Sequence, residues 1–231
     1  LHRVDRRQRQ MCIRDRVFDI NTCGIYEGRE PRFYANIVFH GSQIFFNADK
    51  GAVTVDRYLM DTPDKGDGSL TGYNVWKWID YDNYNYPYAG AGSPDFSTNW
   101  IILRYAEIYL NDAEARLETG DVEGARKAVN MIRQRVGLPD LTESDPEKLR
   151  ELIRKERRIE FAFEEQRFYD VRRWKIGPET QTTLHGVRFV SPTEFKVTKT
   201  DIRTWNDRLY LTPVPHDEIV RSSVLKQNPG Y

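Results

Sequence analysis

The chain has 231 residues, of which 39% are hydrophobic and 13% aromatic, so it is long enough to bury one sizeable core. Its 35 basic and 35 acidic side chains give a formal net charge of zero, which argues against nucleic acid as its main partner. The sequence contains no run of about 18 or more apolar residues, so we predict no transmembrane helix within it.

Residues 1–16 differ in composition from the rest of the chain because they contain six arginines and only two aspartates. A basic arm of this kind is a candidate for binding nucleic acid or anionic lipid. We favour a different interpretation, since the run RRQRQMCIRDR resembles a translated sequencing adapter. It predicts that residues 1–16 are a non-native arm, that residues 17–231 are native, and that the N-terminal half of the natural protein, with its signal peptide, is missing.

The charged block GREPRFYANIVFHG lies within residues 17–41, and we predict that Arg29, Glu30 and Arg32 stand at the start of a short helix. Their expected role is to anchor the preceding loop within the molecule. Residues 42–100 interleave short apolar runs with Gly, Asp, Asn, Ser and Pro. That pattern predicts a loop-rich segment with a few short strands.

Aromatic side chains are concentrated near the middle of this loop-rich segment. Trp76 and Trp78 are two residues apart, as are Tyr84 and Tyr86, so a strand would align each pair on one face. Sugar rings have an apolar face that stacks on aromatic side chains, and acidic and amide side chains nearby would bond the hydroxyls. The alternative is that these aromatics pack the loop onto the helices. The candidate ligand-binding residues are Trp76, Trp78, Tyr81, Tyr84 and Tyr86.

Residues 101–175 form the predicted helical core, with three successive patterns of period 3.6. Gly120 ends the first pattern, Asp121 is placed to cap the second, and Gly137 stops it. The first two patterns with small residues at their contact are typical of a tetratricopeptide-like unit. One such unit cannot bury its own face, so we expect an exposed apolar patch. The apolar face of the first pattern comprises Ile102, Leu103, Ala106, Tyr109, Leu110, Ala113 and Leu117.

The third pattern, which Asp145 caps, is unusual because two carboxylates lie on its apolar stripe. Glu156 and Glu160 share that stripe with Leu149, Leu152, Ile153 and Phe163. A buried carboxylate must be paired or hydrogen-bonded, and nearby arginines can supply partners. We predict a structural ion network with no metal and no catalytic residue. Its expected members are Glu156, Glu160, Glu164, Arg167, Asp170, Arg172 and Arg173.

An alternative interpretation of the two glutamates is an acid/base dyad, as in glycoside hydrolysis. We favour the structural network, because arginines would hold both carboxylates ionised and neither would then be a good general acid. No glycine-rich phosphate loop, serine nucleophile elbow or zinc-binding helix motif occurs in the sequence. Cys12 and Cys23 have no metal-ligand spacing, and the histidines are scattered singly, so we expect no metal and no cofactor.

Residues 176–231 form a mixed C-terminal segment. Residues 187–190 and 194–198 alternate in polarity and predict two strands joined by a turn. Residues 208–215 are expected to be extended, and a short helix is expected to follow Pro215.

Five blocks of the sequence follow one another in the order found in a known family. They are REPRFYANIVFHG at 29–41, RYAEIYLNDAEA at 104–115, AVNMIRQRVGLP at 128–139, ERRIEFAFEEQRFYDVRRW at 156–174 and PVPHDEIVRSSVLKQNPGY at 213–231. Together they resemble the C-terminal half of the SusD/RagB family of nutrient-binding lipoproteins of Bacteroidetes-type outer membranes. The resemblance implies a mainly α SusD-like fold, incomplete in this chain, with tetratricopeptide-like helical pairs, loop-rich segments and a few short strands.

By this resemblance, the intact protein would be a non-catalytic, lipid-anchored protein on the cell surface of the outer membrane. It would capture a glycan, as an oligosaccharide or polysaccharide, and deliver it to a TonB-dependent (SusC-like) transporter. Some family members bind a peptide instead, and a glycoside hydrolase remains a third, less favoured alternative. The membrane would be contacted only through a lipid anchor in the missing N-terminal part.

Overall fold

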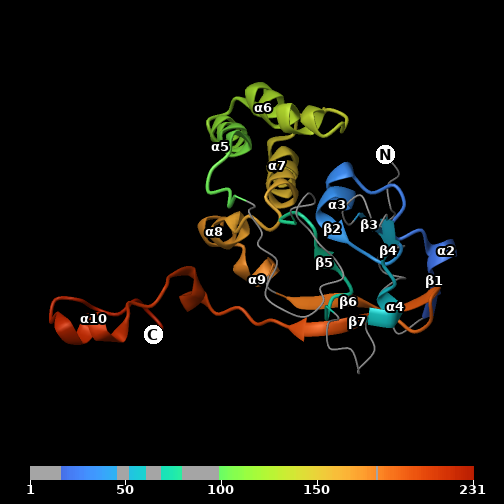
Figure 1. Cartoon of the computed structure of the whole chain (residues 1–231). Coiled ribbons are helices and arrows are strands. Elements are labelled where there is room, and N and C mark those ends of the chain that lie inside the picture. The colour runs from blue at the N-terminus through green and yellow to red at the C-terminus, as the bar shows by residue number, and fades with distance from the viewer. Residues whose placement is uncertain (1–16, 46–51, 61–68, 80–98, 181) are drawn as a thin grey trace.

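The structure is a computed structural model that describes residues 17–45, 52–60, 69–79, 99–180 and 182–231. Within them the fold is mainly α, with short strands in three small antiparallel sheets, as predicted (Figure 1). The three longest helices lie on one side of the molecule and the two longest strands on the other.

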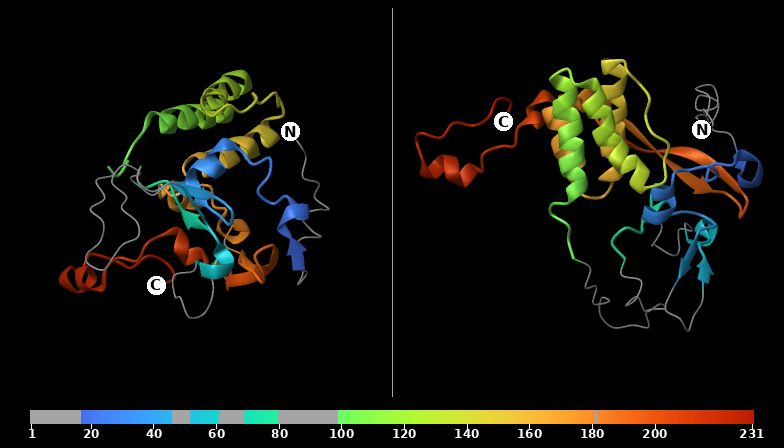
Figure 2. Two further views of the ribbon diagram at one scale, coloured as in Figure 1. Left: turned by 45° about the vertical axis from the view of Figure 1, so that its right-hand side comes forward. Right: turned by 90° about the horizontal axis from the view of Figure 1, so that it is seen from above.

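Helices α5 (Tyr105–Glu118) and α6 (Val122–Arg135) are the predicted helical pair and pack side by side (Figures 1 and 2). Leu110 and Ala113 of α5 are fully buried, and they share one apolar cluster with Ala125 of α6. Small side chains at the contact let the two helices approach closely, since the distance between helix axes depends on the side chains there.

The turn between the two helices follows the predicted signals. Gly120 has a φ of 89°, in the left-handed region that glycine adopts readily, and it follows the end of α5. The carboxylate of Asp121 accepts a hydrogen bond from the backbone N–H of Gly124 at 2.8 Å. This bond satisfies one of the free N–H groups at the start of α6, which confirms the predicted cap.

Helix α5 begins later than the sequence pattern predicts. Ile102 and Leu103 precede the helix and are 86% and 65% exposed, so assigning them to its buried face is wrong. Arg104, at the N-cap, has extended backbone angles with φ −143° and ψ 157°. The ion pairs of its side chain with Glu160 and Glu164 hold that extended conformation, and the helix starts one residue later.

Helix α7 (Pro146–Glu160) begins as predicted, because the side chain of Asp145 accepts hydrogen bonds from two backbone N–H groups of its first turn. Leu149 and Ile153 are buried in the same apolar cluster as α5 and α6. The prediction that Phe163 continues this stripe is wrong. The helix ends before it, and Phe163 lies in the following turn, 41% exposed.

Shorter helices lie outside this core. They are α2 (Ile20–Cys23), α3 (Pro31–Asn36), α4 (Arg57–Met60), α8 (Gln166–Arg173) and α9 (Gly177–Thr180). Of the helices in the described ranges, none combines the length and apolar character needed to cross a bilayer.

The strands form sheets of two or three members, all antiparallel. The largest contains β1 (Val17–Asp19), β6 (Thr183–Phe189) and β7 (Glu194–Ile202) in the order β1-β7-β6. Its β6–β7 hairpin confirms the strands predicted at 187–190 and 194–198. Phe189 and Phe195 face each other across it and are buried. Helix α2 contacts β1, and α4 contacts β6. The two smaller sheets pair β2 (Ile37–Val38) with β5 (Asn74–Val75) and β3 (Gln43–Phe45) with β4 (Ala52–Thr54).

The C-terminal segment contains a 3₁₀ helix, η1 (Asp207–Tyr210), and the predicted short helix α10 (His216–Arg221). The expectation of an extended chain from residue 208 is therefore wrong at its start. The side chain of Asn206 accepts a hydrogen bond from the backbone N–H of Arg208 at 3.0 Å, which stabilises a turn there. The segment carrying α10 projects away from the rest of the described chain (Figures 1 and 2).

Replacement of Leu110 by alanine tests the position of the core. Leu110 is fully buried, so Leu110→Ala should lower the free energy of unfolding by about 2–5 kcal/mol, measured by urea denaturation. Ile102→Ala is the matched control and should change it by about 0.5 kcal/mol or less, because Ile102 is 86% exposed. Equal losses in the two variants would contradict the assigned core.

Candidate functional site

Two carboxylates lie on the buried face of α7. Glu156 and Glu160 are 3% and 2% exposed and stand one helical turn apart. Removing an ionised carboxylate from water is strongly unfavourable unless charged partners and hydrogen bonds replace the water. The partners of these two side chains therefore decide whether α7 can pack in this position.

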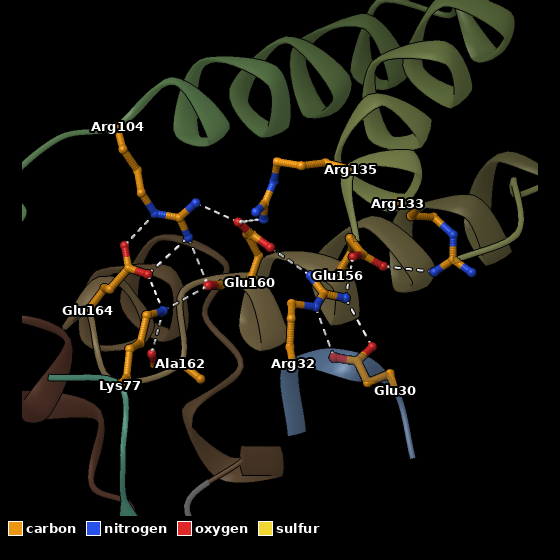
Figure 3. A network of polar contacts seen from close by, with 10 residues as sticks. All are labelled: Glu30, Arg32, Lys77, Arg104, Arg133, Arg135, Glu156, Glu160, Ala162 and Glu164. Atoms are coloured by element: carbon orange, nitrogen blue, oxygen red, sulfur yellow. Dashed lines mark hydrogen bonds and ion pairs between the residues drawn. The ribbon is translucent and has the colours of Figure 1, made fainter. Parts of the chain in front are cut away.

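Arg32 of α3 joins both carboxylates (Figure 3). Its Nη2 donates to Oε1 of Glu156 at 2.6 Å, and its Nη1 donates to Oε2 of Glu160 at 2.7 Å. Glu30 accepts two further hydrogen bonds from the same guanidinium, at 2.9 and 3.0 Å. The block that includes Glu30 and Arg32 is thereby fixed to a helix more than a hundred residues further along the chain.

Three more arginines complete the coordination of the two glutamates. Arg133 donates to Oε2 of Glu156 at 2.9 Å. Arg135 and Arg104 both donate to Oε1 of Glu160, at 2.6 and 2.5 Å. Glu156 thus has two arginine partners and Glu160 has three, drawn from α3, α6 and the N-terminus of α5 (Figure 3).

The prediction that Arg167, Arg172 and Arg173 pair with the glutamates of α7 is wrong. The buried face of α7 points toward α3 and α6, whereas these arginines lie on α8 beyond a turn. Arg173 pairs with Glu114 and Asp170, and Arg172 lies on the ring of Phe168. Arg167 makes no ion pair within the described ranges, although Asp170 attracts its charge.

Asp170 belongs to a second, separate ion cluster. It is 1% exposed, and its carboxylate accepts hydrogen bonds from Nε of Arg157 at 2.8 and 2.9 Å. Arg173 adds a further hydrogen bond at 3.0 Å. This cluster ties α8 to α7 and, through Glu114, to α5.

The arginines control the protonation of Glu160. Burial alone would raise the pKa of this carboxyl, but the hydrogen bonds from Arg104 and Arg32 hold that pKa below its ordinary value of 4.5. Glu160 is therefore ionised at neutral pH and holds no proton to donate. A general acid in glycoside hydrolysis needs a raised pKa, so Glu160 is unsuited to that role.

The same network fixes the turn that follows α7. Phe163 and Glu165 have φ values of 66° and 63°, in the left-handed region that side chains rarely adopt. Nζ of Lys77 donates to the carbonyl oxygens of Glu160 at 3.3 Å and Ala162 at 3.1 Å and pairs with the carboxylate of Glu164 (Figure 3). These bonds satisfy free carbonyl groups at the end of the helix and stabilise the strained turn.

The turn forms part of an open groove with a volume of about 830 Å³. The ring of Trp78 stacks on that of Trp100, with centroids 4.6 Å apart and planes 18° from parallel. The indole N–H of Trp78 donates to the carbonyl oxygen of Phe163 at 3.0 Å. Arg158 and Glu165 add charged groups to the lining. The aromatic lining residues are Trp78, Trp100, Phe161, Phe163, Phe168 and Tyr169.

The candidate ligand-binding aromatics are only partly placed in this groove. Trp78 lines it, but Trp76 does not. The expected strand across these residues ends at Val75, and a turn follows, so the two tryptophans do not share a strand face. The backbone N–H of Trp76 instead donates to the carbonyl oxygen of Asn36 at 2.8 Å. Tyr81, Tyr84 and Tyr86 lie outside the described residues.

Most of the aromatic residues that line the groove were not predicted from the sequence. Trp100, Phe168 and Tyr169 are 55%, 47% and 63% exposed in the groove, yet none was a candidate. Trp100 precedes α5, whereas Phe168 and Tyr169 lie on α8, so the two segments meet only in the folded chain. Within the described ranges, no group of three or more His, Cys, Asp and Glu side chains is placed to hold a metal ion.

The fold and site together define a mainly α-helical protein with a buried carboxylate–arginine network beside an open, aromatic-lined groove. The chain belongs to the SusD family, whose model matches residues 19–231. The family resemblance noted in the sequence is therefore confirmed.

Several known proteins are similar to this chain. A crystal structure of a SusD-like protein from Bacteroides fragilis is 98% identical, with a TM-score of 0.88, over 94% of this chain and 42% of that one. A SusD-like carbohydrate-binding protein from the same species is 26% identical, with a TM-score of 0.63, over 84% of this chain and 41% of that one. SusD-like protein P2 of Formosa agariphila is 38% identical over 62% of this chain and 28% of its own length.

The chain spans less than half the length of each of these relatives. A full-length SusD-family protein that contains this region is therefore the material for functional experiments, with residues numbered as in this chain.

Replacement of Glu160 by glutamine tests the ion network. Glu160→Gln removes the charge that three arginines share, and leaving buried charge uncompensated should lower the free energy of unfolding by about 3–5 kcal/mol. Urea denaturation would measure the change. The control Glu147→Gln should be nearly neutral, because the Glu147 side chain is 82% exposed. A neutral Glu160→Gln would show that the network does not stabilise the fold.

The lowered pKa of Glu160 also predicts a dependence of stability on pH. A carboxyl whose pKa is lower in the folded state stabilises that state above its unfolded value of 4.5. This contribution should be lost as the pH falls below about 4.5 toward the folded-state pKa. Urea midpoints measured over that range should fall more steeply for the wild type than for Glu160→Gln, and parallel curves would contradict the assignment.

Lys77 provides a test of the turn. Lys77→Met keeps the length of the side chain but removes its bonds to two carbonyl oxygens and to Glu164. We expect faster amide hydrogen exchange at residues 161–165, because the left-handed turn loses its main support. Exchange within α6 should be unchanged, which provides the internal control.

Proposed function

We propose that the protein containing this chain binds a carbohydrate in the aromatic groove without altering it chemically. The observation that carries the proposal is the stacked pair of Trp78 and Trp100 beside exposed Phe163, Phe168 and Tyr169. Flat aromatic surface suits the apolar face of a sugar ring, and Arg158 and Glu165 supply polar groups for its hydroxyls. The carbohydrate-binding relative from Bacteroides fragilis supports the same ligand class.

The environment of the glutamates argues against catalysis. Glu156 and Glu160 are both bonded to arginine, and neither lines the aromatic groove. Glu160 and Glu164 do line a separate hollow of about 520 Å³. That hollow is also lined by the arginines that pair with Glu160, which are Arg32, Arg104 and Arg135. A hydrolase would need one carboxylic acid and one carboxylate on opposite sides of the bond that it cleaves. The charges around Glu160 keep it ionised, so the proposed role is capture rather than hydrolysis.

Delivery completes the proposed role. By analogy with the family, the whole protein would sit at the outer-membrane surface through a lipid anchor and pass its ligand to a TonB-dependent (SusC-like) transporter. Capture by an open groove needs only modest affinity, on the order of micromolar to millimolar dissociation constants. Fast release would then allow transfer to the transporter.

Affinity electrophoresis of a full-length protein through gels loaded with a panel of polysaccharides tests this proposal. Retardation by at least one glycan, with no new reducing ends in the mixture, is the expected result. Reducing ends released from the glycan would favour a hydrolase. Retardation by none, together with binding of peptides in a parallel assay, would favour the peptide-binding alternative.

Substitutions in the groove identify the site. Trp78→Ala and Trp100→Ala should each weaken binding about tenfold, because loss of one aromatic stacking partner is worth about 1.5 kcal/mol. Tyr105→Ala is the matched control, since Tyr105 is an exposed aromatic that does not line the groove. An unchanged dissociation constant in both tryptophan variants would place the carbohydrate elsewhere.

A further inference from the structure

A second hollow, of about 460 Å³, lies next to the aromatic groove, between α8 and the segment that leads into η1. Three arginines line it, Arg167, Arg172 and Arg203, together with Phe168 and Trp205. Its volume falls within the range of about 300–1,000 Å³ typical of small-molecule sites. Arg167 and Phe168 also line the aromatic groove, so the two hollows are adjacent.

Arg172 is held in this hollow by aromatic rings. The central carbon of its guanidinium lies 3.4 Å from the centroid of Phe168 and 6.0 Å from that of Trp205. One terminal N–H donates to the carbonyl oxygen of Phe168 at 3.0 Å. Nε of Arg172 is buried and has no hydrogen-bond partner in the part of the chain that the structure describes.

Trp205 provides a second unused donor. Its indole nitrogen is buried and, among the described residues, meets no acceptor. The ring is tightly fixed: a Cβ atom on Gly177 would lie 2.1 Å from Cε2 of the indole, and Tyr210 packs against it with centroids 4.8 Å apart. Both donors belong to side chains that line the same hollow, and because buried donors normally have acceptors, this favours a partner there that accepts hydrogen bonds.

The charge of the hollow has the same sign throughout. The side chain of Arg167 makes no hydrogen bond or ion pair within the described ranges, and burial and the nearby Arg158 lower its pKa more than the attraction of Asp170 raises it. Two carboxylates that interact with these arginines are already engaged elsewhere or at the surface. Asp170 pairs with Arg157 and Arg173, and Asp201 pairs with Arg203 on the exposed side at 3.3 Å.

We propose that this hollow binds an anionic oxygen group, a carboxylate or a sulfate ester, carried by an acidic sugar of the glycan that occupies the neighbouring groove. Such a group accepts several hydrogen bonds and would pair with Arg167, Arg172 and the indole N–H of Trp205. The ring of Trp205 and the apolar groove would contact the sugar itself. This inference rests on the proposed carbohydrate-binding function and makes acidic glycans its substrate class.

A titration of full-length protein labelled with 5-fluorotryptophan, followed by ¹⁹F NMR, tests this site directly. Trp205→Phe assigns the Trp205 resonance, and sodium glucuronate, sodium sulfate and neutral glucose are the probes at constant ionic strength. Glucuronate and sulfate should shift that resonance and glucose should not. Arg167→Gln should weaken glucuronate binding about tenfold, the value of one charged hydrogen bond. Lys127→Gln makes the same charge change on an exposed site and should have no effect.

Arg172→Lys provides a second variant if Arg167→Gln is poorly folded, since it keeps the charge but loses the planar guanidinium. It should also weaken binding. No shift of Trp205 with either anion, or equal shifts with glucose, would overturn the proposed site.

Affinity gels separate this inference from the proposed function. Polygalacturonate should retard the protein more than its methyl-esterified form, which has the same backbone without the charge. Retardation by neutral glycans alone would leave the groove function standing and overturn the acidic specificity. Anion binding at Trp205 without retardation by any glycan would contradict the proposed function. It would also show that the hollow binds free anions and not acidic sugars of a glycan.

Discussion

The pairing of two buried carboxylates on one helix with arginines from three other segments is the interaction on which this structure depends. Glu156 and Glu160 lie on the same face of α7 as Leu149 and Ile153, so the helix cannot bury its apolar stripe without burying their charge. The arginines make that burial possible and join segments that are far apart in sequence. Buried ion pairs often add little net stability over a well-packed apolar core, but removing one partner is strongly destabilising. Here the network selects one arrangement of α3, α5, α6 and α7.

The network also positions the groove. Lys77 and Arg104 bond the carbonyl groups at the end of α7 and pair with Glu164, and the turn that they stabilise carries Phe163. Trp78, the next residue after Lys77, donates to that turn and stacks on Trp100. The charged side chains therefore act on the proposed function indirectly, by fixing the aromatic rings. In this arrangement a carboxylate such as that of Glu164, which does not line the groove, can still be needed for ligand binding.

The sequence predicts the helices well because their signals are local. The cap at Asp121, the glycine at 120 and the period of the apolar residues lie within a few residues of what they determine. It also predicts that Glu156 and Glu160 need charged partners. It does not identify those partners, because Arg32 is more than a hundred residues away and no local pattern links it to α7. The aromatic groove could not be predicted for the same reason, since Trp100 and the residues after α7 meet only in the folded chain.

The central claim is that pairing with the glutamates of α7 holds α3 in place. A double-mutant cycle on Arg32 and Glu160 tests it most directly. The free energies of unfolding of the wild type, Arg32→Met, Glu160→Gln and the double variant would be measured by urea denaturation. Because the two groups are 2.7 Å apart and buried, the account predicts a coupling energy of about 1.5 kcal/mol or more. Additive losses, with a coupling energy near zero, would contradict it and show that the helices pack independently of the network.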